Sequence, residues 1–408
     1  MKKIIVSLAA VAALTTGAMA ADKGIDIVTT GQAVVYYQTS DTDNAANSSL
    51  FNQDQSSANV GVQLNLNADL KNNFTFGSQL TYLGTAGLEN NLVANTRQIG
   101  AVDANGNFTT GSGLDIANKT TDQIMLTKIF VAKKIANTTV KIGRQELPKS
   151  LSPLAYTEGW NVFKNTFDAI LAVNTDLPNT TLVGAYVGNT TGHDLSSTTT
   201  IGNGLANGGA YMLTAQNTSL PMTTVTASYY RLTHMADALW ANIAVADKSL
   251  PMGLKVGIQL GSIDADAADA KTTDAFGIKA SIKPMPALTV CAAYTDVNDG
   301  AVPITNVGTA KKSPLYTQMV ANQSDIAIDA STYMLKAAYS LGDMGTVIAQ
   351  YADTNDNAAA DQDYAELDLI YTATFGGVKY LAAYVMQNEK AANTNDTDIV
   401  RVWARYNF

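Results

Sequence analysis

The sequence predicts a transmembrane β-barrel, and three features support this fold class. Segments of roughly ten residues alternate apolar and polar side chains, and the connections between them alternate between short and long. After the first residues, no apolar run reaches the roughly 18 residues expected of a membrane-spanning helix. Because lipid offers the backbone no hydrogen-bond partners, only helices and closed barrels cross a bilayer. A mean hydropathy of +0.01 suits a barrel whose two faces differ.

Residues 1–20 are organised like a secretory signal peptide. Two lysines precede an apolar run at 4–15, and small residues flank Met19 in an A-x-A pattern that ends at Ala20. The run is too short for a membrane anchor. We expect Sec-dependent export, removal of the leader after Ala20, and one outer-membrane barrel domain from residues 21–408.

The charge and the cysteine content exclude several classes of protein. The formal net charge is −9, and it becomes more negative when the lysines of the leader are removed. An acidic chain of this kind is not expected to bind nucleic acid. The chain has one cysteine, Cys291, so it forms no internal disulfide.

The alternation is clearest at residues 58–69. Ala58, Val60, Val62, Leu64, Leu66 and Ala68 share one face, whereas Asn59, Gly61, Gln63, Asn65, Asn67 and Asp69 share the other. Successive strand residues point to opposite sides, so this segment has one apolar and one polar face. A helix would mix the two sets around its circumference.

Eighteen segments of this type are predicted. They begin near residues 26, 58, 74, 122, 139, 166, 180, 207, 223, 237, 254, 274, 289, 331, 346, 363, 378 and 398. The segments near 122 and 207 have weak patterns, so a barrel of 16 strands is the alternative. An even number places both termini on one side, as in bacterial barrels. All nine prolines fall in predicted turns or loops, as the loss of a backbone donor requires.

The connections are of two kinds. Short turns, for example at Asn72 and Gly376, alternate with longer loops rich in Asn, Thr, Asp and Gly. The longest loops are expected at 85–121 and 298–329. This asymmetry is typical of periplasmic turns and extracellular loops. A soluble β-sandwich would not explain two classes of connection, nor so many apolar faces.

The segment Gly143-Arg144-Gln145-Glu146-Leu147, with Ser152-Pro153-Leu154 and Asn165-Thr166-Phe167-Asp168-Ala169 after it, resembles OprD-like porins. It resembles the epsilonproteobacterial major outer-membrane porins, the Campylobacter-type group, more closely. The resemblance implies an 18-stranded barrel, passive transport of small hydrophilic solutes, and a third extracellular loop, at 148–165, folded into the pore.

The same resemblance bears on assembly and selectivity. OprD relatives are usually monomers with an arginine ladder for carboxylate-bearing solutes, but this chain has only Arg231, Arg401 and Arg405 late in its sequence. The Campylobacter-type relatives form trimers, and we expect a homotrimer. The last strand, with Tyr406 and Phe408, is similar to the terminal aromatic strand that barrel-assembly machinery recognises.

If the apolar faces contact lipid, the charged residues of the opposite faces line the lumen. These are Lys141, Asp168, Lys255, Lys336, Glu366, Asp368, Lys379, Arg401 and Arg405. Each could select ions, or it could simply solvate the wall or pair with another of these charges. The expected constriction places Lys149, Glu158 and Lys164 of the third loop opposite Arg144 or Glu146. Arg144 has the parity of lipid-facing Ile142, so a bulge or a strand end must redirect it.

These observations predict a porin with weak cation selectivity, given the acidic chain. One alternative is a substrate-specific OprD-like channel for carboxylate-bearing solutes, and another is a barrel with an adhesive or structural role. A barrel enzyme is disfavoured because no serine partner for His234 is recognisable. The expected partners are ions, small solutes, outer-membrane lipid and lipopolysaccharide. We expect no cofactor. Calcium held by carboxylates from several loops stays open, without ligands that can be named.

Overall fold

A computed structural model describes residues 25–45, 48–88, 91–98, 101–102, 108–109, 123–193, 195, 199–201, 208–356, 363–389 and 396–408. The predicted signal peptide at 1–20 and most of the expected loop at 85–121 lie outside these residues. Within them, no helix is both long enough and apolar enough to cross a membrane.

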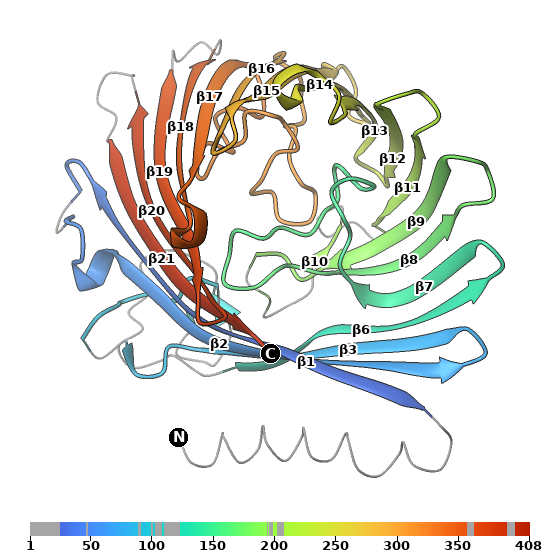
Figure 1. Ribbon diagram of the computed structural model, residues 1–408, viewed down its shortest axis with the longest axis horizontal. Coiled ribbons are helices and arrows are strands. Elements are labelled where there is room, and N and C mark those ends of the chain that lie inside the picture. Colours follow the sequence, from blue (N-terminus) through green and yellow to red (C-terminus); the bar gives the residue numbers. More distant parts are fainter. Residues whose placement is uncertain are drawn as a thin grey trace.

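Figure 1 shows how the wall of a barrel closes. In the described part of the chain, eighteen antiparallel strands form this wall. They are β1 (Asp26–Thr42), β2 (Ser56–Lys71), β3 (Phe74–Gly84), β6 (Gln123–Ile135), β7 (Thr138–Gln145), β8 (Phe167–Asn174), β9 (Thr180–Thr190), β11 (Ala210–Asn217), β12 (Thr223–Leu232), β13 (Ala236–Ala246), β14 (Lys255–Ala265), β15 (Thr273–Met285), β16 (Leu288–Val297), β17 (Ala330–Ser340), β18 (Thr346–Asp356), β19 (Tyr364–Phe375), β20 (Val378–Glu389) and β21 (Thr397–Asn407).

Each wall strand pairs with its sequence neighbours, and the first strand pairs with the last. β1 pairs with β2 on one side and with β21 on the other, where Gln32 lies opposite Asn407. The short β10 (Thr199–Thr200) adds to β9, and β4 (Ala101–Val102) pairs with β5 (Phe108–Thr109) in a separate sheet. The closed wall leaves no free sheet edge in lipid.

The eighteen-strand prediction is confirmed. The largest difference in a strand start is at the segment expected near 207, which begins at Ala210. Tight turns fix the hairpins, since Asn72 and Asn73 have φ of 53° and 64°, and Gly376 and Gly377 have φ of 56° and 80°. Positive φ at two successive positions is the geometry of the two-residue turns that suit strand twist.

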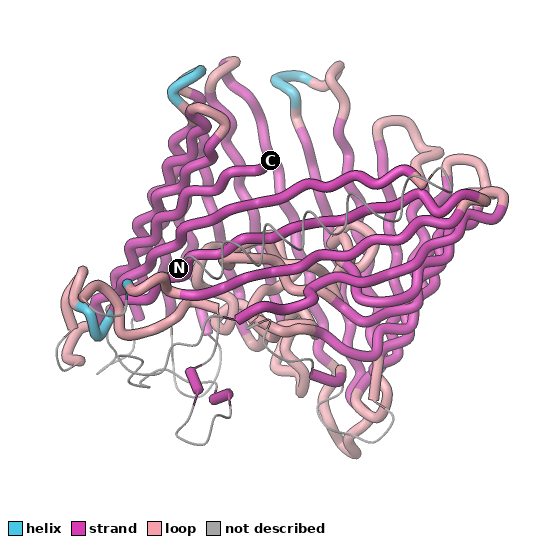
Figure 2. Tube along the Cα trace, turned by 90° about the horizontal axis from the view of Figure 1, so that it is seen from below, coloured by secondary structure: helices cyan, strands magenta, loops and turns pink. Residues whose placement is uncertain are grey.

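The two classes of connection lie at opposite ends of the barrel (Figure 2). One end carries the short turns, including the 3₁₀ helices η3 (Pro251–Gly253) and η4 (Gly342–Met344), whereas η1 (Gln53–Gln55) lies in a longer loop. Along β17 the wall alternates as expected: Tyr333 and Leu335 are 61% and 60% exposed on the outer face, while Thr332 and Met334 are buried. The apolar face therefore points to lipid.

Two loops from the longer-loop end turn into the barrel (Figure 1). One joins β7 to β8 at 146–166, and we name it the first inward loop. The other joins β16 to β17 at 298–329, and we name it the second inward loop. Both contribute to one buried apolar cluster, with Leu154 from the first loop, Ile304 and Leu315 from the second, and Tyr230 and Trp240 from the wall. The sequence predicts an inward course only for the first of these loops, so the inward course of 298–329 is an additional feature of the structure.

Candidate functional site

The two inward loops hold each other through buried hydrogen bonds. The backbone N–H of Tyr156 donates to Asn306 Oδ1 at 3.1 Å, and Asn306 Nδ2 donates to Glu158 Oε1 at 2.8 Å. Glu158 also accepts from the Thr309 hydroxyl and from the backbone N–H of Lys312. Because Asn306 is fully buried, these bonds replace water that the loops displace. The loops therefore narrow the lumen as one unit.

The second inward loop is also bound to the barrel wall. The N–H of Ala321 donates to Glu366 Oε1 at 2.9 Å, and the N–H of Val320 donates to Asp368 Oδ2 at 3.3 Å. Within the loop, Lys312 Nζ donates to the carbonyl oxygen of Val320 at 2.6 Å. Glu366 and Asp368 are completely buried, so they act as acceptors for loop backbone rather than as solvated wall charges.

A cavity of about 800 Å³ lies between the inward loops and the wall strands β11 to β18. We name it the lysine chamber, because its charged lining is Lys149, Lys279, Lys312, Lys336 and Glu158. Its size falls within the ~300–1,000 Å³ range of small-molecule sites. With four lysines and one glutamate, the charged lining carries net positive charge.

Aromatic rings line the same chamber. Lys149 Nζ lies 4.9 Å from the ring centre of Tyr156, and Lys279 Nζ lies 4.0 Å from that of Tyr316. Trp160 also borders the cavity. A lysine on a ring face keeps its positive charge, whereas a carboxylate partner would neutralise it. The chamber can therefore present cations and flat apolar surfaces together.

Burial tunes the two loop lysines of the chamber. Removal from water, together with a smaller effect of nearby Lys279, lowers the pKa of Lys149 to about 8, and Glu158 opposes this shift. Burial, together with a smaller effect of Arg401, likewise lowers the pKa of Lys312 to about 8, and Glu366, Glu158 and Asp368 oppose this shift. Both ammonium groups therefore begin to lose their protons just above neutral pH.

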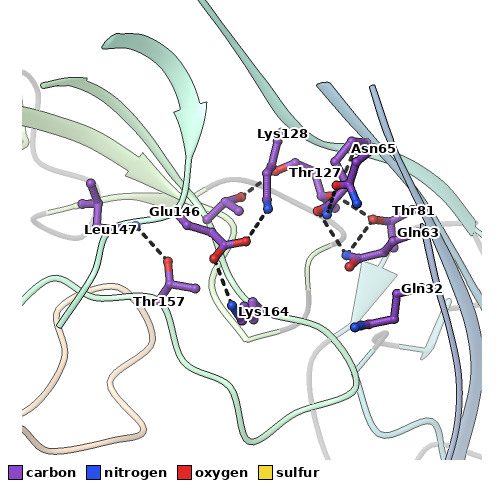
Figure 3. Close-up of polar contacts among 12 residues, drawn as sticks. Gln32, Gln63, Asn65, Thr81, Thr127, Lys128, Glu146, Leu147, Thr157 and Lys164 are labelled. Carbon is purple, nitrogen blue, oxygen red and sulfur yellow. Dashed lines mark hydrogen bonds and ion pairs between the residues drawn. The ribbon is translucent and has the colours of Figure 1, made fainter. Parts of the chain in front are cut away.

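The other side of the first inward loop carries a three-residue ion network (Figure 3). Glu146 pairs with Lys128 of β6 and with Lys164 of the loop, the latter at 3.1 Å. Lys128 has the sequence parity of lipid-facing Leu126. The register shift between β3 and β6 inserts Thr127 and turns Lys128 toward Gln79 and the lumen. The two-residue alternation that runs through Leu126 therefore does not predict that Lys128 faces the lumen.

Arg144 and Asp168 were predicted to line the pore, but they lie on the outer face of the barrel. They pair at 2.7 Å across β7 and β8, where they are register partners. Two residues along each strand, Ile142 and Ile170 are exposed on the outer face, whereas Phe167 is buried inside. The regular ladder places the ion pair on the outer face as well, so no bulge redirects Arg144 into the pore.

The other predicted charges lie on the lumen side of the wall or in the inward loops. Lys141 contacts the Phe130 ring, Arg401 Nε donates to Gln38 Oε1 at 2.9 Å, and Arg405 donates to Gln32 Oε1 at 2.6 Å. By strand parity, Lys255 and Lys379 face the lumen near the short turns. Glu158 does not face Arg144, because it binds the second inward loop.

Sequence reasoning also missed Lys279 and Lys312. Lys279 shares its strand face with buried Gly277 and Ala275, so the alternation of β15 contained the signal. Lys312 carries no such signal, because it lies in an irregular loop. In the described residues, no group of three or more His, Cys, Asp or Glu is placed to hold a metal ion.

The closed 18-strand wall with loops folded inside defines a porin-type barrel. Solved structures with a similar fold are Pseudomonas aeruginosa outer-membrane channels of the OccK/OprD group. OccK8 (OprE) matches with a TM-score of 0.73 and 14% identity, over 94% of this chain and 98% of that one. OccK9 (OpdG) matches with a TM-score of 0.73 and 15% identity, over 94% of this chain and 98% of that one. OpdK, solved with vanillate, matches with a TM-score of 0.71 and 13% identity, over 93% of this chain and 98% of that one.

These likenesses establish the fold. No family model matches the sequence, and no curated protein matches it.

Proposed function

We propose that this protein is an outer-membrane channel for passive diffusion of small hydrophilic solutes, with a preference for small carboxylate-bearing anions. The lysine chamber carries the proposal, because its four lysines face one glutamate in a cavity of about 800 Å³. A lumen lined by one sign of charge lowers the barrier for the opposite ion. This is the substrate-specific alternative stated above, in place of weak cation selectivity.

The net charge of the chain does not set the sign of the field inside it. Several carboxylates lie on the outer rim, where Asp266 pairs with Arg231 at 2.6 Å and Asp296 accepts from the Tyr294 hydroxyl. Exposed charges are screened by salt over about 10 Å, whereas charges around a narrow cavity act directly on a passing ion. Glu366 and Asp368 are engaged by loop N–H groups.

Aromatic carboxylates fit the chamber best. Lys279 and Lys336 would meet the carboxylate, and Tyr316 and Trp160 offer surface to a ring. In the described residues, neither Lys279 nor Lys336 has an ion-pair partner. OpdK, a structural neighbour, was solved with vanillate, which is an aromatic carboxylate.

Reversal potentials of the purified protein in planar bilayers test this proposal. Under a potassium benzoate gradient, we expect a reversal potential whose sign shows that benzoate permeates more readily than potassium. Lys336→Met should move the reversal potential toward zero. The control Lys271→Met removes an exposed lysine that pairs with Asp299 outside the chamber, and it should leave the potential unchanged. A cation-favouring potential in the unmodified protein would overturn the proposal.

Assembly and location are proposed from the leader pattern, the family resemblance and the terminal strand. We propose export with leader removal after Ala20, insertion among outer-membrane lipid and lipopolysaccharide, and association as a homotrimer like the Campylobacter-type relatives. The terminal strand supports recognition by barrel-assembly machinery, since Phe408 closes the barrel through its backbone bonds to Gly31 and its side chain is exposed. Cross-linking of purified protein tests the trimer.

A further inference from the structure

A second compartment lies between the first inward loop and the wall strands β1, β2, β3, β6, β7 and β21. It consists of two adjoining hollows of about 460 and 410 Å³, which share Asn65, Lys128 and Glu146. Among the described residues, none that lines these hollows also lines the lysine chamber. Each hollow is within the ~300–1,000 Å³ range of small-molecule sites. The first inward loop therefore separates two spaces of different lining.

The wall of this compartment is built from carboxamides, and we name it the amide compartment (Figure 3). They come from four strands and are Gln32, Gln63, Asn65, Gln79 and Asn407. Gln63 and Gln79 are only 7% and 5% exposed.

Hydrogen bonds fix these side chains in place. Gln63 Nε2 donates to Gln79 Oε1 at 3.1 Å and to Thr81 Oγ1 at 3.0 Å. Gln79 Nε2 donates to Asn65 Oδ1 at 2.7 Å, and Thr127 Oγ1 donates to Gln79 Oε1 at 2.8 Å. Each carboxamide has two donors and an oxygen that accepts twice, so this network leaves both donors and acceptors for a solute.

Three of the four described cations that line the amide compartment are held by polar groups, and the fourth, Lys141, lies on the Phe130 ring. Lys128 and Lys164 both pair with Glu146. Arg405 donates to Gln32 Oε1 at 2.6 Å and to the carbonyl oxygen of Val162 at 3.0 Å. Lys149 and Lys279 of the lysine chamber also lie on aromatic rings. An anion entering the amide compartment would compete with Glu146 for its lysines and would meet carboxamide oxygens that it cannot pair.

We propose that the amide compartment binds neutral polyhydroxyl solutes, of which monosaccharides are the simplest. A hydroxyl both donates and accepts, so it can pair with the amide N–H groups, the amide oxygens and Glu146 together. A carboxylate only accepts, and it suits the lysine chamber instead. The inference rests on the protein being a channel but not on its anion preference. The two compartments then serve two classes of solute within one barrel.

Two readouts on the full-length folded protein test this inference. Glucose permeation is followed by the swelling rate of proteoliposomes, and anion preference by the reversal potential in potassium benzoate. Gln79→Met keeps the volume of the side chain but removes its hydrogen bonds, so glucose swelling should fall about three- to tenfold. The reversal potential should not change. Lys336→Met should move the reversal potential toward zero and leave the glucose swelling rate unchanged.

Asn65→Leu is the second variant, because Gln79 lies deeper in the network and its replacement could impair folding. Heat-modifiable migration on gels shows whether each variant forms a barrel. If folded Gln79→Met and Asn65→Leu both keep the glucose rate, or slow glucose while also moving the benzoate potential, the inference is overturned. If Lys336→Met leaves the benzoate potential unchanged while the amide variants slow glucose, the anion proposal fails and this inference stands.

Discussion

Asp368 of the barrel wall accepts a hydrogen bond from the backbone N–H of Val320 in the second inward loop, at 3.3 Å. Two residues earlier on β19, Glu366 accepts the N–H of Ala321 at 2.9 Å. The loop thus docks on two completely buried carboxylates. Gln350 also donates to Asp368, and the Tyr364 hydroxyl donates to Glu366. The width of the lumen depends on this docking, because the loop has no strand structure of its own.

Glu366→Ala should loosen the second inward loop. The substitution leaves the Ala321 N–H and the Tyr364 hydroxyl without their acceptor, at a cost of about 2 kcal/mol, or roughly a 30-fold shift toward undocked loop. Single-channel recordings should show a larger, noisier conductance. Glu366→Gln keeps an acceptor for Ala321 and serves as the matched control. A Glu366→Ala channel as quiet and as narrow as the unmodified one would show that these bonds do not hold the loop.

Anion preference should fall as pH rises from about 6 to 9. Burial lowers the pKa of Lys149 and of Lys312 to about 8, so both lysines are charged below that pH and neutral above it. Burial raises the pKa of Asp325 in the second inward loop to about 6, so this carboxyl becomes negative as pH passes that value. As pH rises, the lysines lose positive charge and Asp325 gains negative charge, so both changes make the net charge of the loops more negative.

Reversal potentials at fixed salt, measured across this pH range, check the prediction. Lys149→Met should flatten the upper part of the curve, because one of the two groups that titrate near pH 8 is then absent. An anion preference that is constant from pH 6 to 9, or that increases, would contradict the assignment of Lys149 and Lys312 to the conducting path.

Cys291 should be a native reporter of the lumen. It lies on β16 on the face of buried Ala293, and its register partner is Lys336. Lysines beside a thiol attract an anionic reagent, so a sulfonate-bearing methanethiosulfonate should react faster than its trimethylammonium counterpart. Modification should reduce conductance, because the added group lies on the lumen side of the wall beside Lys336. Cys291→Ser is the control, and no response in the unmodified protein would place the thiol outside the conducting path.

The strand map was largely predictable because it depends on local patterns. Alternation of side chains, turn residues and proline positions located the strands, with the start at Ala210 as the largest error. The path of 298–329 was not predictable. Its buried residues Ile304, Leu315 and Ile326 lie eleven residues apart, too far for the two-residue alternation by which strands are recognised. Their burial depends on partners in distant strands and in the first inward loop.

The lumen charges were predictable only where the ladder is regular. Parity placed Glu366, Asp368 and Arg401 on the lumen side, but the inserted Thr127 reversed it for Lys128. A bulge depends on hydrogen bonds across the sheet, here those of Thr127 with Thr81 and Gln79, which the sequence does not display.

Asp168→Asn tests the outward position of the Arg144–Asp168 pair. Both side chains are about a quarter to a third exposed, so losing the pair should cost on the order of 0.5–1 kcal/mol. The temperature at which the protein unfolds, followed by its heat-modifiable migration, should fall slightly. The reversal potential should stay unchanged, since the charge lies on the outer face of the barrel. Glu146→Gln is the lumen-facing counterpart, and it should move the potential toward stronger anion preference. If Asp168→Asn moves the potential as much as Glu146→Gln does, the carboxylate faces the pore, and the strand register of β7 and β8 that we describe is wrong.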